Sequence, residues 1–369
     1  MIKRNPKLLR FVCFVSSHGF GHATRVSAII QQISKKFTSL EVIIVGESPL
    51  WFWQINMPSN CVFYLHEQVT DVGLVQIDPF THDLSLTLKK VDKLISILSN
   101  PPKGLVEKVA NFQPHFILCD ISLLGIKVGG ILGVPSILVE NFTWDWIYEP
   151  LKSERKDFKR VIHIFKEIYK RASRRIQCTP VCQEIDGVTK INPVCREPTV
   201  DRDSLFSKLS LGQENKYIVV TTGGISMHYA FDKVPEPYFL VVPGEYPKII
   251  ISNGVIYLPM NSDIPFPDII NFASCVVGKA GYGTVSECWG MNVPFLGVFR
   301  QNFRESDILR NFCLKNLISE EITPSHFMSG AWLKSFPDLI DEANSKDSTI
   351  RQNGATQACE EILRYIFPK

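Results

Sequence analysis

Short apolar runs alternate with segments whose apolar residues keep helical spacing along most of the chain. Val26, Ile29, Ile30 and Ile33, for example, recur at the three- and four-residue intervals of one helix face. Short apolar runs between such segments are typical of buried strands. In the first half they predict strands at residues 11–15, 41–46, 61–66, 115–119 and 135–139, with helices between them.

The same alternation begins again in the second half. Strands are expected at residues 217–220, 238–242, 248–251, 255–258, 274–277 and 294–299, and helices at 263–272, 306–316, 332–343 and 355–367. Two consecutive α/β series predict two doubly wound, Rossmann-like domains facing across a cleft. We place the domains at residues 1–195 and 196–369, with a linker at 191–215 and a last helix able to pack back on the first domain.

Each series contains a strand, a glycine-rich turn and a helix in succession, at residues 11–37 and 274–291. Such a turn exposes backbone N–H groups, and the start of the helix adds partial positive charge, so a phosphate or diphosphate is well received there. Glycines also let the backbone approach a ligand closely. Any ligand crevice is expected beyond the carboxyl ends of the strands.

Charge and cysteine content narrow the possible partners. The 369 residues carry a formal charge of +3 and contain no recognisable nucleic-acid module, so no nucleic acid is expected as a partner. Ten scattered cysteines are interpreted as reduced thiols, which favours a cytoplasmic protein. No stretch approaches the ~20 apolar residues that a spanning helix needs, and the first apolar run is not followed by a signal-peptide cleavage site.

Residues 151–175 predict one basic helix. Ten Lys or Arg against three Asp or Glu give this segment a local charge of +7. A solvated helix face is the favoured interpretation. The alternative is a patch for an anionic acceptor or for peripheral contact with a membrane.

Four motifs, taken together and in order, resemble a known family. They are HGFGHATR at residues 18–25, NFTWDWIY at 141–148, GKAGYGTVSE at 278–287 and FRESDILRN at 303–311. They are similar to the glycosyltransferase-like amino-terminal half of plant-type L-arabinokinases and, more distantly, to GT-B glycosyltransferases. Arabinokinases of this type continue into a sugar-kinase domain, whereas this sequence ends at Lys369, so kinase activity is not expected of it.

The resemblance implies that the second domain holds a nucleotide-sugar donor. Glu287 matches the glutamate that binds the ribose hydroxyls, although Thr284 and Glu287 also have the spacing of a capping box. Glu305, Ser306 and Asp307 match the residues that bind the donor sugar, the alternative being that Ser306 caps the next helix. The other expected donor-binding residues are Gly223, Gly224, Lys279, Gly281, Tyr282, Gly283 and Thr284.

A catalytic base is expected in the first domain. An inverting transfer needs a base for the acceptor hydroxyl, and an imidazole serves near neutral pH. By the resemblance His22 is that base and Asp120 orients it, with His18 as the competing histidine. Ala280 stands where retaining relatives carry a glutamate, which favours inversion.

The acceptor is expected to lie on the first domain. The residues predicted to bind it are Gly19, Phe20, Gly21, Trp144, Asp145, Trp146 and Tyr148. The spacing of Trp144, Trp146 and Tyr148 equally fits one face of a short buried strand. The Asp-x-Asp at residues 201–203 falls in the expected linker, and no metal is expected because backbone dipoles can stabilise the leaving diphosphate.

The sequence therefore predicts an inverting, metal-independent GT-B glycosyltransferase without a cofactor. Its donor is a nucleotide diphosphate sugar, with UDP expected, and its acceptor is a hydroxyl of a small molecule, a glycan or a lipid-linked compound. One alternative is a UDP-sugar 2-epimerase, which shares the fold class. The other is a nucleotide-sugar-binding protein without catalysis, which would not need His22 and Asp120.

Overall fold

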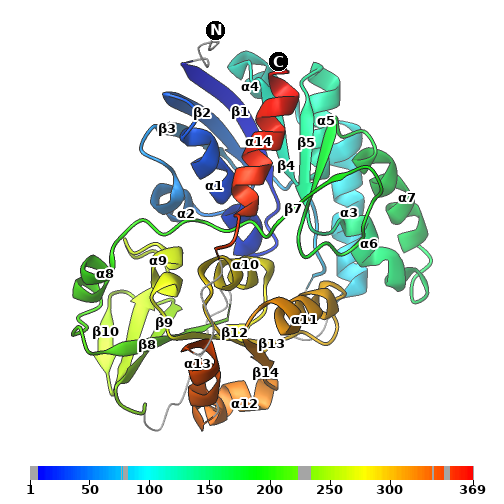
Figure 1. The fold of residues 1–369 in the computed structure, drawn as a ribbon. Coiled ribbons are helices and arrows are strands. Elements are labelled where there is room, and N and C mark those ends of the chain that lie inside the picture. The colour runs from blue at the N-terminus through cyan, green and yellow to red at the C-terminus, as the bar shows by residue number, and fades with distance from the viewer. Residues whose placement is uncertain are drawn as a thin grey trace. The chain divides into compact units, whose positions relative to one another are not determined.

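The computed structural model describes residues 7–75, 77, 82–222, 234–334, 336–344 and 350–368. The chain divides into two compact units. The first unit comprises Met1–Val194, Asn302–Glu305 and Asn353–Lys369, and the second comprises Cys195–Gln301 and Ser306–Gln352. Each unit is built on its own sheet, and Figure 1 labels elements of both where there is room.

The first unit contains a seven-stranded parallel sheet in the order β3-β2-β1-β4-β5-β6-β7. Its strands are β1 (Leu8–Val15), β2 (Ser39–Val45), β3 (Cys61–His66), β4 (Phe116–Asp120), β5 (Ser136–Glu140), β6 (Arg174–Cys178) and β7 (Thr189–Ile191). Its helices are α1 (Phe20–Ser34), α2 (Leu50–Asn56), α3 (Leu84–Ser99), α4 (Lys103–Phe112), α5 (Leu123–Leu132), α6 (Trp144–Tyr148), the 3-10 helix η1 (Glu149–Lys152), α7 (Phe158–Tyr169) and α14 (Gly354–Ile366).

The strand order of this sheet reverses between β1 and β4, so right-handed crossovers place helices on both of its faces. Helix α1 packs against α14, whereas α5 packs against α3, α4 and α7 (Figure 1). Every residue of β4 and β5 is buried, as strands covered on both faces require. The point of reversal is also where open parallel sheets bind ligands at the carboxyl ends of their strands.

Local sequence signals account for several helix boundaries in the first unit. Asp83 caps α3 by accepting a hydrogen bond from the N–H of Leu86 at 2.7 Å, and Ser122 caps α5 through the N–H of Gly125. Helix α1 begins differently, because its N-cap is Gly19 with φ 83° and offers no side-chain acceptor. The first N–H groups of α1 therefore lack a side-chain cap.

The second unit contains another seven-stranded sheet, in the order β10-β11-β9-β8-β12-β13-β14, which is parallel apart from β10. Its strands are β8 (Lys216–Thr221), β9 (Tyr238–Gly244), β10 (Ile250–Ser252), β11 (Val255–Pro259), β12 (Cys275–Lys279), β13 (Phe295–Val298) and β14 (Ser319–Glu321). Its helices are α8 (Arg202–Lys208), α9 (Phe266–Asn271), α10 (Tyr282–Met291), α11 (Glu305–Asn316), α12 (Pro324–Ser329), η2 (Ala331–Lys334) and α13 (Phe336–Asn344).

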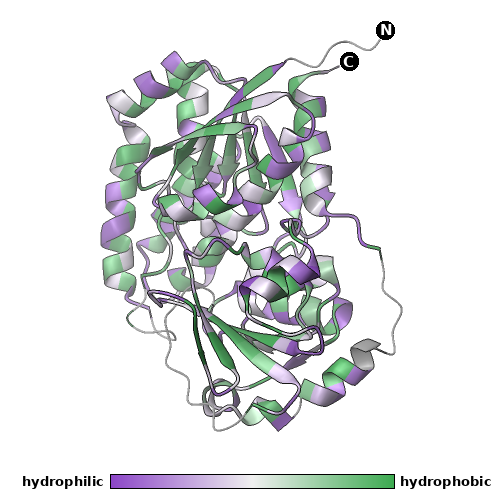
Figure 2. Cartoon of the chain, turned by 90° about the vertical axis from the view of Figure 1, so that its left-hand side faces the viewer, coloured by the Kyte–Doolittle hydropathy of each residue, from purple (hydrophilic) through white to green (hydrophobic). Residues whose placement is uncertain are grey.

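Alternate residues of the second sheet enter two different hydrophobic clusters. Val219 and Val276 belong to one cluster, whereas Ile218 and Val277 belong to the other. Side chains alternate between the faces of a strand, so the two clusters lie on opposite faces of the sheet. Figure 2 accordingly shows strands that are largely hydrophobic and helices divided between hydrophobic and hydrophilic residues. Within the described ranges, no helix combines the length and the apolar composition needed to cross a membrane.

The expectation of one basic helix over residues 151–175 is wrong. The segment contains the end of η1, helix α7 and the first residues of β6. Arg174 and Arg175 pair in register with β5 and form ion pairs with Glu361 and Glu140. Exposed lysines and arginines of the segment also bond to nearby acids, as Arg160 does to Asp92. These pairs fit a solvated face and give no support to a membrane patch.

The expected linker at residues 191–215 is also partly wrong. Residues from Cys195 onward belong to the second unit, and they include helix α8. Asp201 caps this helix by accepting from the N–H of Ser204 at 2.8 Å. Leu205 and Phe206 are buried in the core of the unit. These two apolar residues were the feature of this polar segment that indicated a helix.

A glycine in β12 supplies a first test of the fold. Gly278 pairs with Thr221 of β8, and a Cβ at Gly278 would come within 1.8 Å of the Thr221 carbonyl oxygen. Gly278→Ala is expected to lower the free energy of unfolding by about 3 kcal/mol or more, because the two strands must separate. Urea unfolding measures this change.

Gly281→Ala is the matched control, because a Cβ there meets no described atom within 4 Å. Its expected cost is about 1 kcal/mol or less, the difference between Gly and Ala at an N-cap. Equal losses of stability in the two variants would contradict the close approach of β8 and β12.

Candidate functional site

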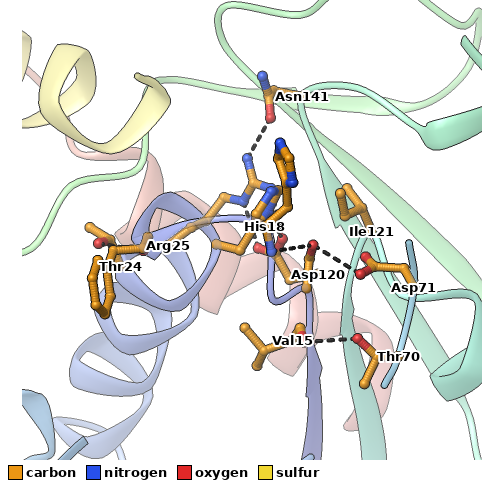
Figure 3. A network of polar contacts seen from close by, with 12 residues as sticks. Val15, His18, Thr24, Arg25, Thr70, Asp71, Asp120, Ile121 and Asn141 are labelled. Carbon is orange, nitrogen blue, oxygen red and sulfur yellow. Dashed lines mark hydrogen bonds and ion pairs between the residues drawn. The ribbon is translucent and has the colours of Figure 1, made fainter. Parts of the chain in front are cut away.

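Polar side chains gather in the first unit where the strand order reverses (Figure 3). β1 and β4 are in register at Val15 and Asp120, so the loop that follows β1 meets the end of β4. That loop leads into α1, whose first turn carries His22. His22 Nδ1 lies 2.7 Å from Asp120 Oδ1, and both side chains are buried. The histidine and the carboxylate expected from the sequence are therefore in contact.

Arg25, one turn after His22, also binds Asp120. Its Nε donates to Oδ2 at 2.7 Å and its Nη2 donates to Oδ1 at 2.8 Å. Its Nη1 donates to Oδ1 of Asn141 at 2.7 Å (Figure 3). Only 1% of Arg25 and none of Asp120 is exposed, so each charge depends on the other for compensation.

The sequence contained a usable signal for Arg25. It lies in the recognised motif beside Val26, on a helix whose buried residues include Val26 and Ile29. A charge inside an apolar helix needs a buried partner. The motifs by themselves assign no role to Arg25 or to Asn141.

The contacts of Nδ1 determine the tautomer of His22. A carboxylate without a proton can only accept, so Nδ1 must carry the hydrogen that Asp120 accepts. Arg25 Nη2 lies 3.2 Å from the same Nδ1, but both are then donors and this contact is not a hydrogen bond. Nε2 consequently keeps its lone pair, and no hydrogen bond to it is found among the described residues.

Asp120 is a carboxylate at neutral pH. Burial raises the pKa of this group, but the charges and hydrogen bonds of Arg25 and His22 outweigh that effect, and the pKa of Asp120 lies below its ordinary value. The anion that orients His22 is thus stabilised by a permanent cation on the same helix.

A second buried carboxylate, Asp71, lies at the same edge of the sheet, in the loop after β3 (Figure 3). Its Oδ1 accepts from Ser16 Oγ at 3.1 Å, and its Oδ2 accepts from Trp144 Nε1 at 2.9 Å. Burial raises the pKa of Asp71 to about 6, against the opposing effects of Trp144, His22 and Ser16. No motif or periodicity marked this loop, so sequence reasoning missed Asp71.

His18 has an aromatic environment. Its ring meets the ring of Trp144 edge-on at 5.3 Å between centroids and stacks on Phe303 at 6.1 Å. The backbone of Gly73 is so close that a Cβ there would lie 2.3 Å from Nδ1 of His18. His22 Nδ1 lies 2.7 Å from Asp120 Oδ1, the contact expected of a base that a carboxylate orients.

The aromatic motif at residues 144–148 forms a helix, α6, so the alternative of a strand is wrong. Trp144 and Tyr148 have no exposed surface. The indole of Trp144 donates to Asp71, and the hydroxyl of Tyr148 donates to the carbonyl of Val72 at 2.5 Å. These two residues fix the loop after β3. Both rings are buried, which agrees with the alternative of core packing and differs from the expected exposed platform for an acceptor.

Other expected acceptor residues keep some capacity for a ligand. Phe20 is half-buried and packs beside Trp51, with 5.5 Å between ring centroids, and Gly19 before it is exposed. Asp145 Oδ1 is buried and has no hydrogen-bond partner in the described part of the chain. Trp146 carries the guanidinium of Arg304 4.0 Å from its ring centre.

Glu305, expected to bind the donor sugar, groups with the first unit. Its Oε1 accepts from Asn141 Nδ2 at 2.7 Å. Asn141 thus links Glu305 to Arg25, and Arg25 links Asn141 to Asp120. Ser306 lies inside α11, so the alternative that it caps this helix is wrong. Its Oγ is buried without a partner among the described residues, and Asp307 is exposed.

In the second unit, the glycine turn after β12 leads directly into α10. This helix begins at Tyr282 with Gly281 as its N-cap, and neither a side-chain cap nor an acidic residue occupies its first turn. The capping-box alternative for Thr284 and Glu287 is therefore wrong. Glu287 is buried and its Oε1 accepts from Arg196 Nε at 2.7 Å.

The remaining expected donor residues divide by exposure. Tyr282 and Gly283 are buried, whereas Lys279, Gly281 and Thr284 are half-buried. Gly223 and Gly224 lie outside the described residues. No side chain of the described residues caps this helix start, and a helix start of this kind suits an anion.

The raised pKa of Asp71 predicts a pH dependence of stability. Between the ordinary value of 3.8 and the folded value of about 6, the folded state binds a proton that the unfolded state releases. This carboxyl therefore adds stability below about pH 4 that is lost as the pH rises through about 6, by about 3 kcal/mol.

Urea unfolding of the parent and of Asp71→Asn at several pH values measures this term. The stability of the parent relative to Asp71→Asn is expected to fall by about 3 kcal/mol between pH 4 and 7. A difference that stays constant over this range would contradict the burial of an ionisable Asp71.

Comparison with known proteins agrees on the fold. No protein-family model matches the chain. Over 337 residues, 90% of this chain, the sequence is 25% identical to the L-arabinokinase of Arabidopsis thaliana, and it spans about a third (32%) of the length of that protein. This similarity agrees with the resemblance that the four motifs carry.

Two solved structures are similar to the chain over nearly its whole length. One is a UDP-glucosyltransferase from Polygonum tinctorium, with 12% identity, complete coverage of both chains and a TM-score of 0.57. The other is UGT2 of Phytolacca americana in complex with UDP-2-fluoro-glucose and pterostilbene, with 12% identity, coverage of 97% and 99%, and a TM-score of 0.56. The chain therefore has the α/β fold of GT-B glycosyltransferases, as the sequence predicted.

Proposed function

We propose that this protein is an inverting, metal-independent glycosyltransferase that moves a sugar from a nucleotide diphosphate, with UDP as the expected nucleotide, to an acceptor hydroxyl. The observation that carries the proposal is the 2.7 Å contact between His22 Nδ1 and Asp120 Oδ1 at the strand reversal of a GT-B fold. Inverting transfer needs one base and a stabilised leaving group.

In the proposed reaction His22 Nε2 takes the proton of the acceptor hydroxyl. The acceptor oxygen attacks the anomeric carbon from the face opposite the diphosphate, and the bond from that carbon to the diphosphate breaks with its electron pair leaving on the phosphate oxygen. Asp120 stabilises the imidazolium that forms through the Nδ1–H hydrogen bond. The product sugar therefore has the inverted configuration.

The proposed diphosphate site is the turn before α10. Gly281 has a conformation open to other residues, with φ −126°, and a Cβ there would meet no described atom. The fold itself therefore does not require glycine at this position. A glycine here would instead let a ligand approach the backbone closely. Glu287 would share its carboxylate between the ribose and Arg196.

Residues with unused hydrogen-bonding capacity support the proposed sugar and acceptor contacts. Ser306 Oγ and Asp145 Oδ1 are both buried without a partner among the described residues. We assign Ser306 to the donor, and Asp145 with Phe20 to the acceptor.

His22→Ala tests the base. Because general base catalysis contributes about 10²- to 10⁴-fold, kcat for transfer or for donor hydrolysis is expected to fall by that factor, while binding of the donor is retained. His163→Ala, on the exposed face of α7, is the matched control and is expected to keep the parent rate. If His22→Ala transferred sugar as fast as the parent protein, His22 could not be the base.

A thermal-shift series with nucleotide-sugars tests the donor site. A donor at a hundred times its dissociation constant is expected to add about 2.7 kcal/mol to the stability of the parent. Gly281→Ala is expected to lose most of this gain, because its methyl group occupies the approach to the turn. Equal stabilisation of both proteins would contradict the assignment, and stabilisation without any product from the parent would leave a binding protein instead of a transferase.

A further inference from the structure

The carboxylate that orients His22 is already engaged by a second residue. Arg25 binds both oxygens of Asp120, at 2.7 and 2.8 Å, and a third acceptor on Asn141, at 2.7 Å. Its guanidinium also lies 3.2 Å from His22 Nδ1. In a Ser-His-Asp arrangement the carboxylate orients the imidazole and stabilises the imidazolium that forms. Here a permanent cation stands beside the same pair.

We infer that Arg25 is a positioning residue of the proposed base, which holds the Asp120 carboxylate in place against Nδ1–H of His22 and offsets the charge of Asp120, so that protonation of the ring is less favourable than Asp120 alone would make it. The inference rests on the proposed function only in taking His22 to be the catalytic base. The arrangement of charge can be tested on the free protein.

The geometry gives Arg25 two effects on His22. By binding both Asp120 oxygens it fixes the plane of the carboxylate, and the carboxylate fixes the imidazole. By its charge it opposes a second cation on a ring only 3.2 Å away, in a buried site where charges are weakly screened. The charges of Arg25 and Asp120 thus act on the ring in opposite senses.

In the described part of the chain, charged groups from three elements bear on His22. Arg25 lies on α1, Asp120 ends β4, and Asp71 lies in the loop after β3, where the charge of His22 acts on its pKa. Arg25 balances Asp120, whereas Asp71 accepts hydrogen bonds from the neutral side chains of Ser16 and Trp144. The titration of His22 is therefore measured in two proteins, one that retains Asp71 and one that carries Asp71→Asn.

Arginine suits this position better than lysine. A planar guanidinium reaches Asp120 Oδ1, Asp120 Oδ2 and Asn141 Oδ1 at once, whereas an ammonium group is a point charge on a flexible stem. Arg25→Lys therefore retains the cation and loses the fixed geometry. Arg25→Met loses both.

NMR of the histidine ring resonances during a pH titration tests the charge effect without any substrate. The His22 signals are assigned by their loss in His22→Gln. In Arg25→Met the pH at which they titrate is expected to rise by about 1–2 units, because Asp120 then acts alone. In Arg25→Lys the shift is expected to stay within about 0.5 unit.

Arg175→Met is the matched control, since Arg175 forms a comparable ion pair with Glu140 on the neighbouring strand, at 2.9 Å. It is expected to leave the His22 titration unchanged. An unshifted titration in Arg25→Met would overturn the inference. If Arg25→Met does not fold, Arg25→Lys decides, and a shift of more than about 1 unit in that variant would overturn it.

The rate of sugar transfer separates positioning from general damage. Arg25→Met is expected to lose at least about 10-fold in kcat/KM at pH 7 and to recover part of it at alkaline pH, where the ring is again unprotonated. A loss by the same factor at every pH would overturn the inference and indicate structural damage. Absence of transfer in the parent would count against the proposed function, while the NMR titration would still decide the role of Arg25.

Discussion

A carboxylate sealed from water must be matched by donors, and the first unit is arranged around the way Asp120 is matched. Arg25 and His22 reach it from one turn of α1, and Asn141 holds the other end of Arg25 from the segment after β5. Neither the charge of Arg25 nor that of Asp120 could be buried alone without a cost of several kcal/mol. The pair therefore ties α1, β4 and the end of β5 to one another.

The backbone directly after Asp120 is locally strained. Ile121, the next residue, has φ 45°, which is unfavourable for a β-branched residue. It is held there by the hydroxyl of Tyr169, which donates to its carbonyl at 2.8 Å, and by its own N–H, which donates to Val139. Strain of this kind persists where the packing around it is over-determined, and it is common at functional sites.

Much of the fold could be predicted from the sequence, because strand and helix periodicities reflect burial directly. The meeting of His22 with Asp120 was predictable, since both follow strands whose carboxyl ends share one edge of a parallel sheet. Asp71 was not, because its loop has no periodicity and its partners lie 55 and 73 residues away. The prediction of one basic helix over residues 151–175 was wrong because Arg174 and Arg175 favour a helix by composition but pair with a buried strand. The roles of Trp144 and Tyr148 depended on which way their polar atoms pointed, which spacing does not encode.

The tautomer of His22 is the most direct measure of this account, because base, carboxylate and arginine all act through Nδ1. A ¹⁵N-labelled sample above neutral pH, with His22 assigned by substitution, reports which ring nitrogen carries the hydrogen. The account predicts a proton on Nδ1 and an unprotonated Nε2 that faces the substrate. A neutral ring protonated on Nε2 would contradict it, because Asp120 could then neither orient His22 nor stabilise its charge.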